Sequence, residues 1–103
     1  MQSKLKIDLD WLPPYEWLLS YRDMIITILD PFVIVSKIEY KLSPGEKGYH
    51  VIIDLGEEIN DMMALKLQFL LGDDRTRCRL NFARIKGGVE GWNKLWSYKI
   101  KRD

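Results

Sequence analysis

The sequence has only one cysteine and one histidine, and these scarcities exclude several kinds of site. Without a second cysteine, Cys78 cannot form an internal disulfide or a cysteine-rich zinc site. His50 alone cannot supply the paired histidines of a rolling-circle initiator. A P-loop, a dinucleotide-binding Gly-x-Gly fingerprint and a Gly-x-Ser-x-Gly elbow are also missing. We therefore expect a protein of a reducing, cytoplasmic compartment that is neither a nucleotide-hydrolysing P-loop enzyme nor a serine hydrolase.

Long apolar runs and a charge excess are also lacking. The longest apolar runs are far too short to span a bilayer, so no membrane partner is expected. Lys and Arg number 16 and Asp and Glu 15, which leaves a net charge of +1 and no global field for nucleic acid. The 103 residues predict one domain, 1–103, with a single core.

Periodicity predicts the order of elements along the chain. Period-two alternation over 5–10 predicts a half-buried strand, and helical spacing predicts a helix from Tyr15 to about Leu29. Two strands over 32–42 and 49–55 flank a Pro-Gly turn as a hairpin. A second helix follows and ends at Gly72, because glycine tolerates left-handed geometry. Strands are then predicted over 78–86 and 94–101.

This order predicts an α+β, ferredoxin-like (RRM-like) βαββαβ domain with an extra C-terminal strand. Two helices would cover one face of the antiparallel sheet and leave the other face open. In this topology the first and third strands are central neighbours, and the fourth lies beside the first. Strand alternation then assigns Leu80 and Phe82 to the core, along with the apolar residues of the first and third strands.

The opposite parity places polar side chains from three segments on the open face. Asp8 and Asp10 come from the first strand, His50 from the third, and Arg79 and Asn81 from the fourth. Two carboxylates at i and i+2 can share Mg²⁺ or Mn²⁺, and a histidine opposite them can bind phosphate. The simpler alternative is an ordinary solvated sheet face.

A family resemblance favours the first interpretation. Ile7-Asp8-Leu9-Asp10, followed by Gly48-Tyr49-His50-Val51, resembles the first two motifs of the archaeo-eukaryotic primase superfamily, whose palm is RRM-like. The resemblance implies that Asp8 and Asp10 hold Mg²⁺ or Mn²⁺ and that His50 contacts the phosphates of a nucleotide. Asn81 stands at the third catalytic position, where the family has a metal-binding aspartate. This implies binding of nucleotide or single-stranded nucleic acid rather than catalysis.

Residues 70–75 and 77–80 resemble segments of small uncharacterised proteins of archaea and their viruses and plasmids. In this region Arg75, Arg77 and Arg79 alternate, and such a stripe can follow a phosphate backbone. The alternative is ion pairing with Asp73 and Asp74.

The C-terminal segment offers a further candidate site. Lys99 and Lys101, together with Lys94 and Arg102, are interleaved with Trp96 and Tyr98, an arrangement that can hold phosphates and stack bases. Trp96 and Tyr98 can instead pack into the core or a dimer contact, and Trp92 can likewise lie in a symmetric dimer contact. A non-catalytic interaction module that forms homodimers is therefore the alternative to a nucleic-acid-binding protein.

Overall fold

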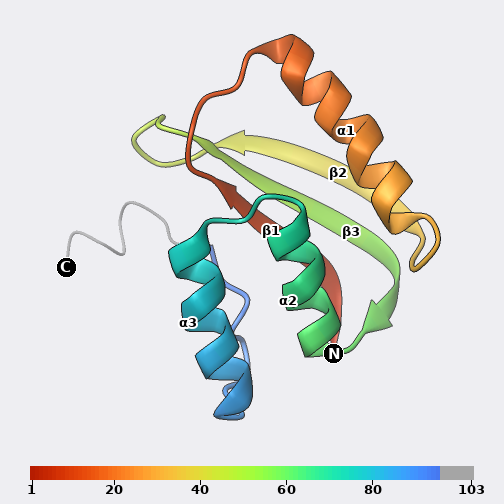
Figure 1. The fold of residues 1–103 in the computed structure, drawn as a ribbon, viewed down its shortest axis with the longest axis vertical. Helices are drawn as coiled ribbons and strands as arrows, with labels where there is room; N and C mark the ends of the chain where they lie inside the picture. The colour runs from red at the N-terminus through yellow and green to blue at the C-terminus, as the bar shows by residue number, and fades with distance from the viewer. Residues whose placement is uncertain (96–103) are drawn as a thin grey trace.

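The computed structural model describes residues 1–95, which form a three-stranded antiparallel sheet and three helices (Figure 1). The strand order is β1-β3-β2. This confirms the α+β class. No helix in residues 1–95 is long and apolar enough to cross a membrane. In chain order the elements are β1 (Gln2–Leu9), α1 (Tyr15–Leu29), β2 (Val35–Leu42), β3 (Tyr49–Ile59), α2 (Asp61–Leu70) and α3 (Arg75–Lys86).

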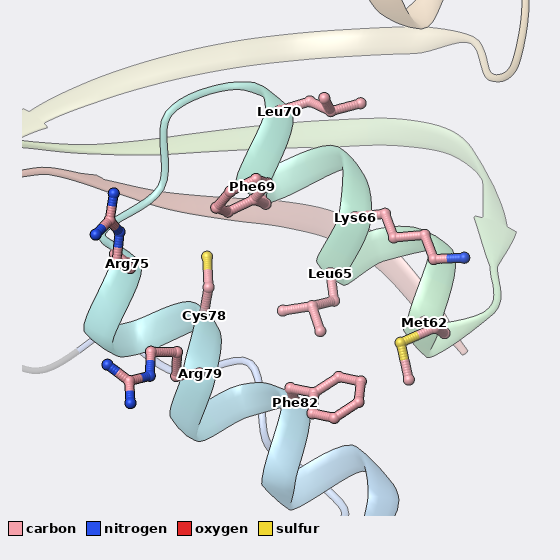
Figure 2. A pocket seen from close by; sticks show the side chains of 9 residues that line it. All are labelled: Met62, Leu65, Lys66, Phe69, Leu70, Arg75, Cys78, Arg79 and Phe82. Carbon is pink, nitrogen blue, oxygen red and sulfur yellow. The ribbon is translucent and has the colours of Figure 1, made fainter.

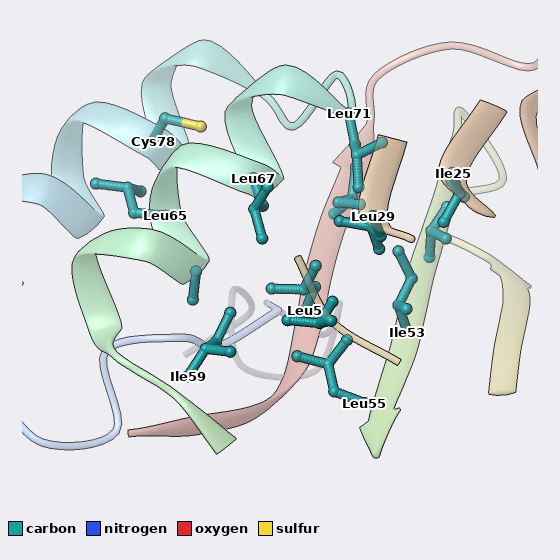
Figure 3. Packing of buried hydrophobic residues seen from close by; sticks show 14 of the residues in the cluster. Leu5, Ile25, Leu29, Ile53, Leu55, Ile59, Leu65, Leu67, Leu71 and Cys78 are labelled. Atoms are coloured by element: carbon teal, nitrogen blue, oxygen red, sulfur yellow. The ribbon is translucent and has the colours of Figure 1, made fainter. Parts of the chain in front are cut away.

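The core lies between one face of the sheet and helices α1 and α2 (Figure 3). Alternate residues of β1 and β3 point into it, as the period-two pattern predicts. Tyr21 connects α1 to the end of α2, because its hydroxyl donates a 2.6 Å hydrogen bond to the carbonyl of Leu71. The buried residues of the strands and of these helices include Leu5, Ile7, Leu9, Val51, Ile53, Leu55, Tyr21, Ile25, Leu29, Ala64, Leu65 and Leu67.

The predicted strand over 78–86 is wrong, because these residues belong to helix α3. Asp74 caps the helix through a carboxylate that accepts a 3.0 Å hydrogen bond from the Arg77 amide. Basic residues in the last turn favour the same helix through its dipole. Leu80 and Phe82, predicted to be buried, are each 48% exposed.

A fourth strand beside β1 is therefore not formed by residues 78–86, and residues 1–95 do not make the predicted ferredoxin-like βαββαβ sheet. Polar side chains occupy that position instead. The Lys6 amide donates to Gln68 Oε1 at 2.9 Å and the Asp8 amide to Asp73 Oδ1 at 2.8 Å. Arg77 Nη1 donates to the Lys6 carbonyl at 2.8 Å. These bonds satisfy backbone groups that an edge strand otherwise exposes.

We call Gln68, Asp73, Arg77 and Asn93 the β1-edge cluster. Asn93 Nδ2 donates to Gln68 Oε1 at 2.8 Å and to the Lys4 carbonyl at 3.4 Å. All four residues are buried. Buried polar groups are stable only when they are hydrogen-bonded to one another or to the backbone, so this cluster fixes α2, α3 and residues 91–95 against β1. Of the predicted last strand, residues 96–101 lie outside the described residues.

Candidate functional site

Asp8 and His50 face each other on the sheet face predicted to be open, which α1 and α2 do not cover and on which the His50 side chain is 14% exposed. They are directly opposed in the β1–β3 register, and His50 Nε2 lies 3.8 Å from Asp8 Oδ1. The Asp8 amide and carbonyl both point away from β3, toward Asp73 and Asp74. The two residues therefore form a non-hydrogen-bonded pair, the kind in which side chains approach most closely. This part of the predicted constellation is brought together by the fold.

Two opposing effects act on the pKa of the Asp8 carboxyl. Partial burial raises the pKa of its carboxyl, whereas the neighbouring His50 acts to lower it. Asp10 follows the end of β1 and is exposed. Within residues 1–95, no three His, Cys, Asp or Glu side chains are grouped so as to hold a metal ion. The predicted Mg²⁺ or Mn²⁺ site therefore rests on Asp8 and Asp10 alone, and it stays a prediction.

Asn81 does not join this face. It lies on α3, is fully buried, and its Oδ1 accepts a 3.1 Å hydrogen bond from Arg84 Nη1. The predicted placement of Asn81 beside Asp8 and His50 on one sheet surface is wrong, because the strand that would carry it is a helix. Arg79 is absent from the sheet face for the same reason.

The three alternating arginines lie on helix α3, where residues two positions apart point in different directions. Arg75 and Arg79 therefore share one side of the helix, and Arg77 lies on another. Arg77 points inward and is 5% exposed. Its Nη1 donates to Asp73 Oδ2 at 2.6 Å, its Nη2 to Asn93 Oδ1 at 2.9 Å and its Nε to the Lys94 carbonyl at 3.0 Å. The alternative of pairing with Asp73 is therefore confirmed, and the predicted contact of Arg77 with nucleic acid stays a prediction for which little of its surface is available. Burial raises the pKa of the Asp73 carboxyl, and Arg77 opposes that shift.

Arg75 and Arg79, one turn apart on α3, border a pocket of about 740 Å³ between α2 and α3. In Figure 2, apolar side chains of both helices face the space between them, with the two arginines on α3 and Lys66 on α2. The lining contains three basic residues and no acidic ones. The full lining is Met62, Leu65, Lys66, Phe69, Leu70, Arg75, Cys78, Arg79 and Phe82.

Several pocket residues remain open to solvent. Phe69 is 58% exposed, Leu70 63% and Phe82 48%. The buried side of α2 carries Ala64, Leu65, Leu67 and Gln68, which leaves Phe69 and Leu70 on its exposed side. The pocket was missed because α3 was read as a strand. The Asp74 cap and the i, i+4 spacing of Cys78 and Phe82 were the available signals.

Cys78 contributes little reactivity to this pocket. It is 7% exposed, and its Sγ lies 3.4 Å from Asp73 Oδ2. Burial, reinforced by the Asp73 carboxylate, raises the pKa of the thiol to about 12. A thiol that stays protonated near neutral pH is a poor nucleophile.

At the C-terminal end, Trp92 packs into the core and is 2% exposed. Trp96, Tyr98, Lys99 and Lys101 lie outside the described residues, so the predicted base-stacking and phosphate contacts there stay predictions.

A protein of Sulfolobus islandicus filamentous virus (isolate Iceland/Hveragerdi), named Uncharacterized protein 30, is 40% identical to this chain over 63 residues. The similar region is 58% of this chain and 24% of the viral protein, so the chain spans about a quarter of that relative's length. No protein-family model and no solved structure matches. The predicted likeness to an uncharacterised protein of an archaeal virus is thus confirmed, and it carries no information about activity.

Proposed function

We propose that this domain is a non-catalytic protein-binding module that receives an acidic, amphipathic helix of a partner protein in the α2–α3 pocket. The observation that carries the proposal is the combination of an open apolar lining with a wholly basic set of charges. Exposed apolar patches bordered by polar residues commonly mark interaction sites in proteins.

The charges select the chemistry of the partner. Lys66 stands on α2, while Arg75 and Arg79 stand on α3. A partner segment between them can place apolar side chains on Phe69 and Phe82 and carboxylates toward the basic residues. Complementary charges of this kind fix orientation and speed association.

The dimensions favour a helix as the occupant. The pocket is built by two helices of 10 and 12 residues, which at 1.5 Å per residue are roughly 15 and 18 Å long. A partner helix of three to four turns matches this length, with apolar residues at i, i+3, i+4 and i+7 as anchors in a helix-in-groove complex.

Two designed peptides of about four helical turns test the charge requirement. One carries Leu at the anchor spacing and Glu elsewhere, and its twin carries Lys in place of Glu. Fluorescence anisotropy is expected to show at least about tenfold tighter binding of the Glu peptide, and Arg75→Glu/Arg79→Glu should reverse that preference. Phe69→Ala should weaken binding of both peptides, because it removes exposed apolar surface without disturbing the core.

The matched control is Arg22→Glu/Lys47→Glu, which makes the same change in net charge at exposed positions outside the pocket lining. It should leave the preference for the Glu peptide in place. Absence of binding at millimolar peptide, or an equal loss in the control, would contradict the proposal.

Asp8 and His50 favour a second candidate function. We propose it as a degenerate primase-like face that binds nucleotide or single-stranded nucleic acid. Its support is the 3.8 Å approach of His50 to Asp8. Mg²⁺ is commonly held by one or two carboxylates together with water and phosphate oxygens, so Asp8 and Asp10 suffice for a weak site.

Titration with Mn²⁺, followed by NMR, tests this candidate. Selective broadening of the Asp8, Asp10 and His50 signals is expected, because paramagnetic broadening is strongest nearest the ion. The effect should disappear in Asp8→Ala/Asp10→Ala. Broadening that is uniform, or that persists in this variant, would remove the candidate.

A further inference from the structure

The two edges of the sheet differ in how their backbone groups are satisfied. The β1 edge is covered by the β1-edge cluster and by the Asp74 amide, which donates to the Asp8 carbonyl at 3.0 Å. In residues 1–95, no strand pairs with the outer edge of β2. An unpaired edge is a template for another strand.

The register identifies which β2 groups are available. Lys6 and Asp8 turn their backbone groups away from β3, so the opposed residues Ile52 and His50 turn theirs toward β2. Hydrogen-bonded and non-hydrogen-bonded pairs alternate in an antiparallel ladder. The amides and carbonyls of Ile38 and Tyr40 therefore point outward, away from β3.

The surroundings of this edge combine apolar side chains with charged ones, Arg22 and Asp30 among them. A hollow of about 230 Å³ lies between α1 and the start of β2, with Ile26, Ile34 and Ile38 in its lining. Ile26 is 42% exposed and Ile34 67%. A strand added here would bury apolar surface as well as forming backbone hydrogen bonds.

Lys37 and Glu39 of β2 form an ion pair within one copy, with 3.7 Å between Lys37 Nζ and Glu39 Oε1, and the same two charges are complementary to those of a second copy. Lys37 and Glu39 share the open face of the sheet, since both are opposed to open-face residues of β3. An antiparallel pair centred on Ile38 sets Lys37 of each copy opposite Glu39 of the other, twice by symmetry. A pair centred on Glu39 would set like charges opposite each other, which is destabilising. A pair centred on Tyr40 also joins opposite charges but overlaps over fewer residues of the strand.

We propose that the β2 edge is a homodimer interface, in which two copies pair antiparallel about Ile38 and form a continuous six-stranded sheet. The two-fold axis makes this contact closed, so it yields a dimer rather than a fibre. The interface is separate from the α2–α3 pocket.

Charge exchange across the interface tests the register as well as the dimer. At low salt, sedimentation equilibrium should give a dimer for the natural chain. Lys37→Glu and Glu39→Lys should each weaken dimerisation by at least about tenfold, because each sets two like-charge pairs opposite one another. An equimolar mixture of the two single variants, and the double variant Lys37→Glu/Glu39→Lys, should both dimerise again.

Ile38→Pro provides a second test. Because the Ile38 amide points away from β3, proline there removes no hydrogen bond of the β2–β3 ladder, yet it blocks pairing with another copy. The variant should be monomeric with an unchanged circular dichroism spectrum. Lys47→Glu, an exposed reversal in the hairpin turn, is the control and should remain dimeric. A natural chain that is monomeric at millimolar concentration, or a dimer that Lys37→Glu leaves unchanged, would overturn the proposal.

Discussion

Arg77→Met is expected to lower the free energy of unfolding by about 3–5 kcal/mol, the usual cost of removing one partner from a buried ion pair. Asp73 has a fully buried carboxylate, and Arg77 is its salt-bridge partner. The same arginine also bonds to the carbonyls of Lys6 and Lys94 and to Asn93. Its loss therefore leaves a buried charge and several buried acceptors unsatisfied. Chemical denaturation measures the change, which is a large share of a typical domain's stability.

Arg79→Met is the matched control, two residues along the same helix. Arg79 is exposed at the pocket, so its replacement should change stability by no more than about 0.5 kcal/mol. Amide hydrogen exchange can distinguish the role of Arg77 in covering the β1 edge from a general loss of stability. In Arg77→Met the amides of Lys6 and Asp8 should exchange faster than the other β1 amides, which bond to β3. Equal stability of the two variants would contradict the role given to the β1-edge cluster.

Gly48→Ala is expected to cost roughly 3 kcal/mol, because a Cβ at this position would lie 2.0 Å from the Leu9 carbonyl oxygen. That contact is with backbone, so relief requires β1 and the hairpin turn to separate near the Asp8–His50 pair. Thermal denaturation should show a fall in Tm of roughly 12 °C or more.

Gly45→Ala is the control within the same turn. Gly45 has a φ of +89°, but an added Cβ would meet nothing within 4 Å. Only the conformational penalty of about 1 kcal/mol is then expected. A Gly48→Ala variant no less stable than Gly45→Ala would contradict the close approach of the turn to β1.

Elements with strong local signals were predictable from the sequence. The first helix was predicted at the bounds it has, because Pro14 precedes it and Asp30-Pro31 follows it. The placement of Asp8 and His50 on one sheet face followed from strand parity and from the predicted pairing of the first and third strands. Gly72 has a φ of +95° and lies just after the end of α2, where the sequence predicted that the helix would stop.

The third helix was not predictable by the same argument, because Cys78, Leu80 and Phe82 alternate with polar residues as in a strand. Helical capping by Asp74 outweighs that alternation, since it satisfies an amide that would otherwise lack a partner. The covering of β1 by Gln68, Asp73, Arg77 and Asn93 depends on contacts between residues up to about 90 positions apart. Local patterns carry no information about such contacts.

The most direct test of the proposed binding function is amide NMR mapping of the complex with the Glu peptide. Shifts should be concentrated at Leu65, Phe69, Arg75 and Phe82, on the two helices that form the pocket, with little change at His50. Shifts centred on Asp8 and His50, or spread evenly over the sheet, would contradict the proposed binding function and would place binding on the open sheet face instead.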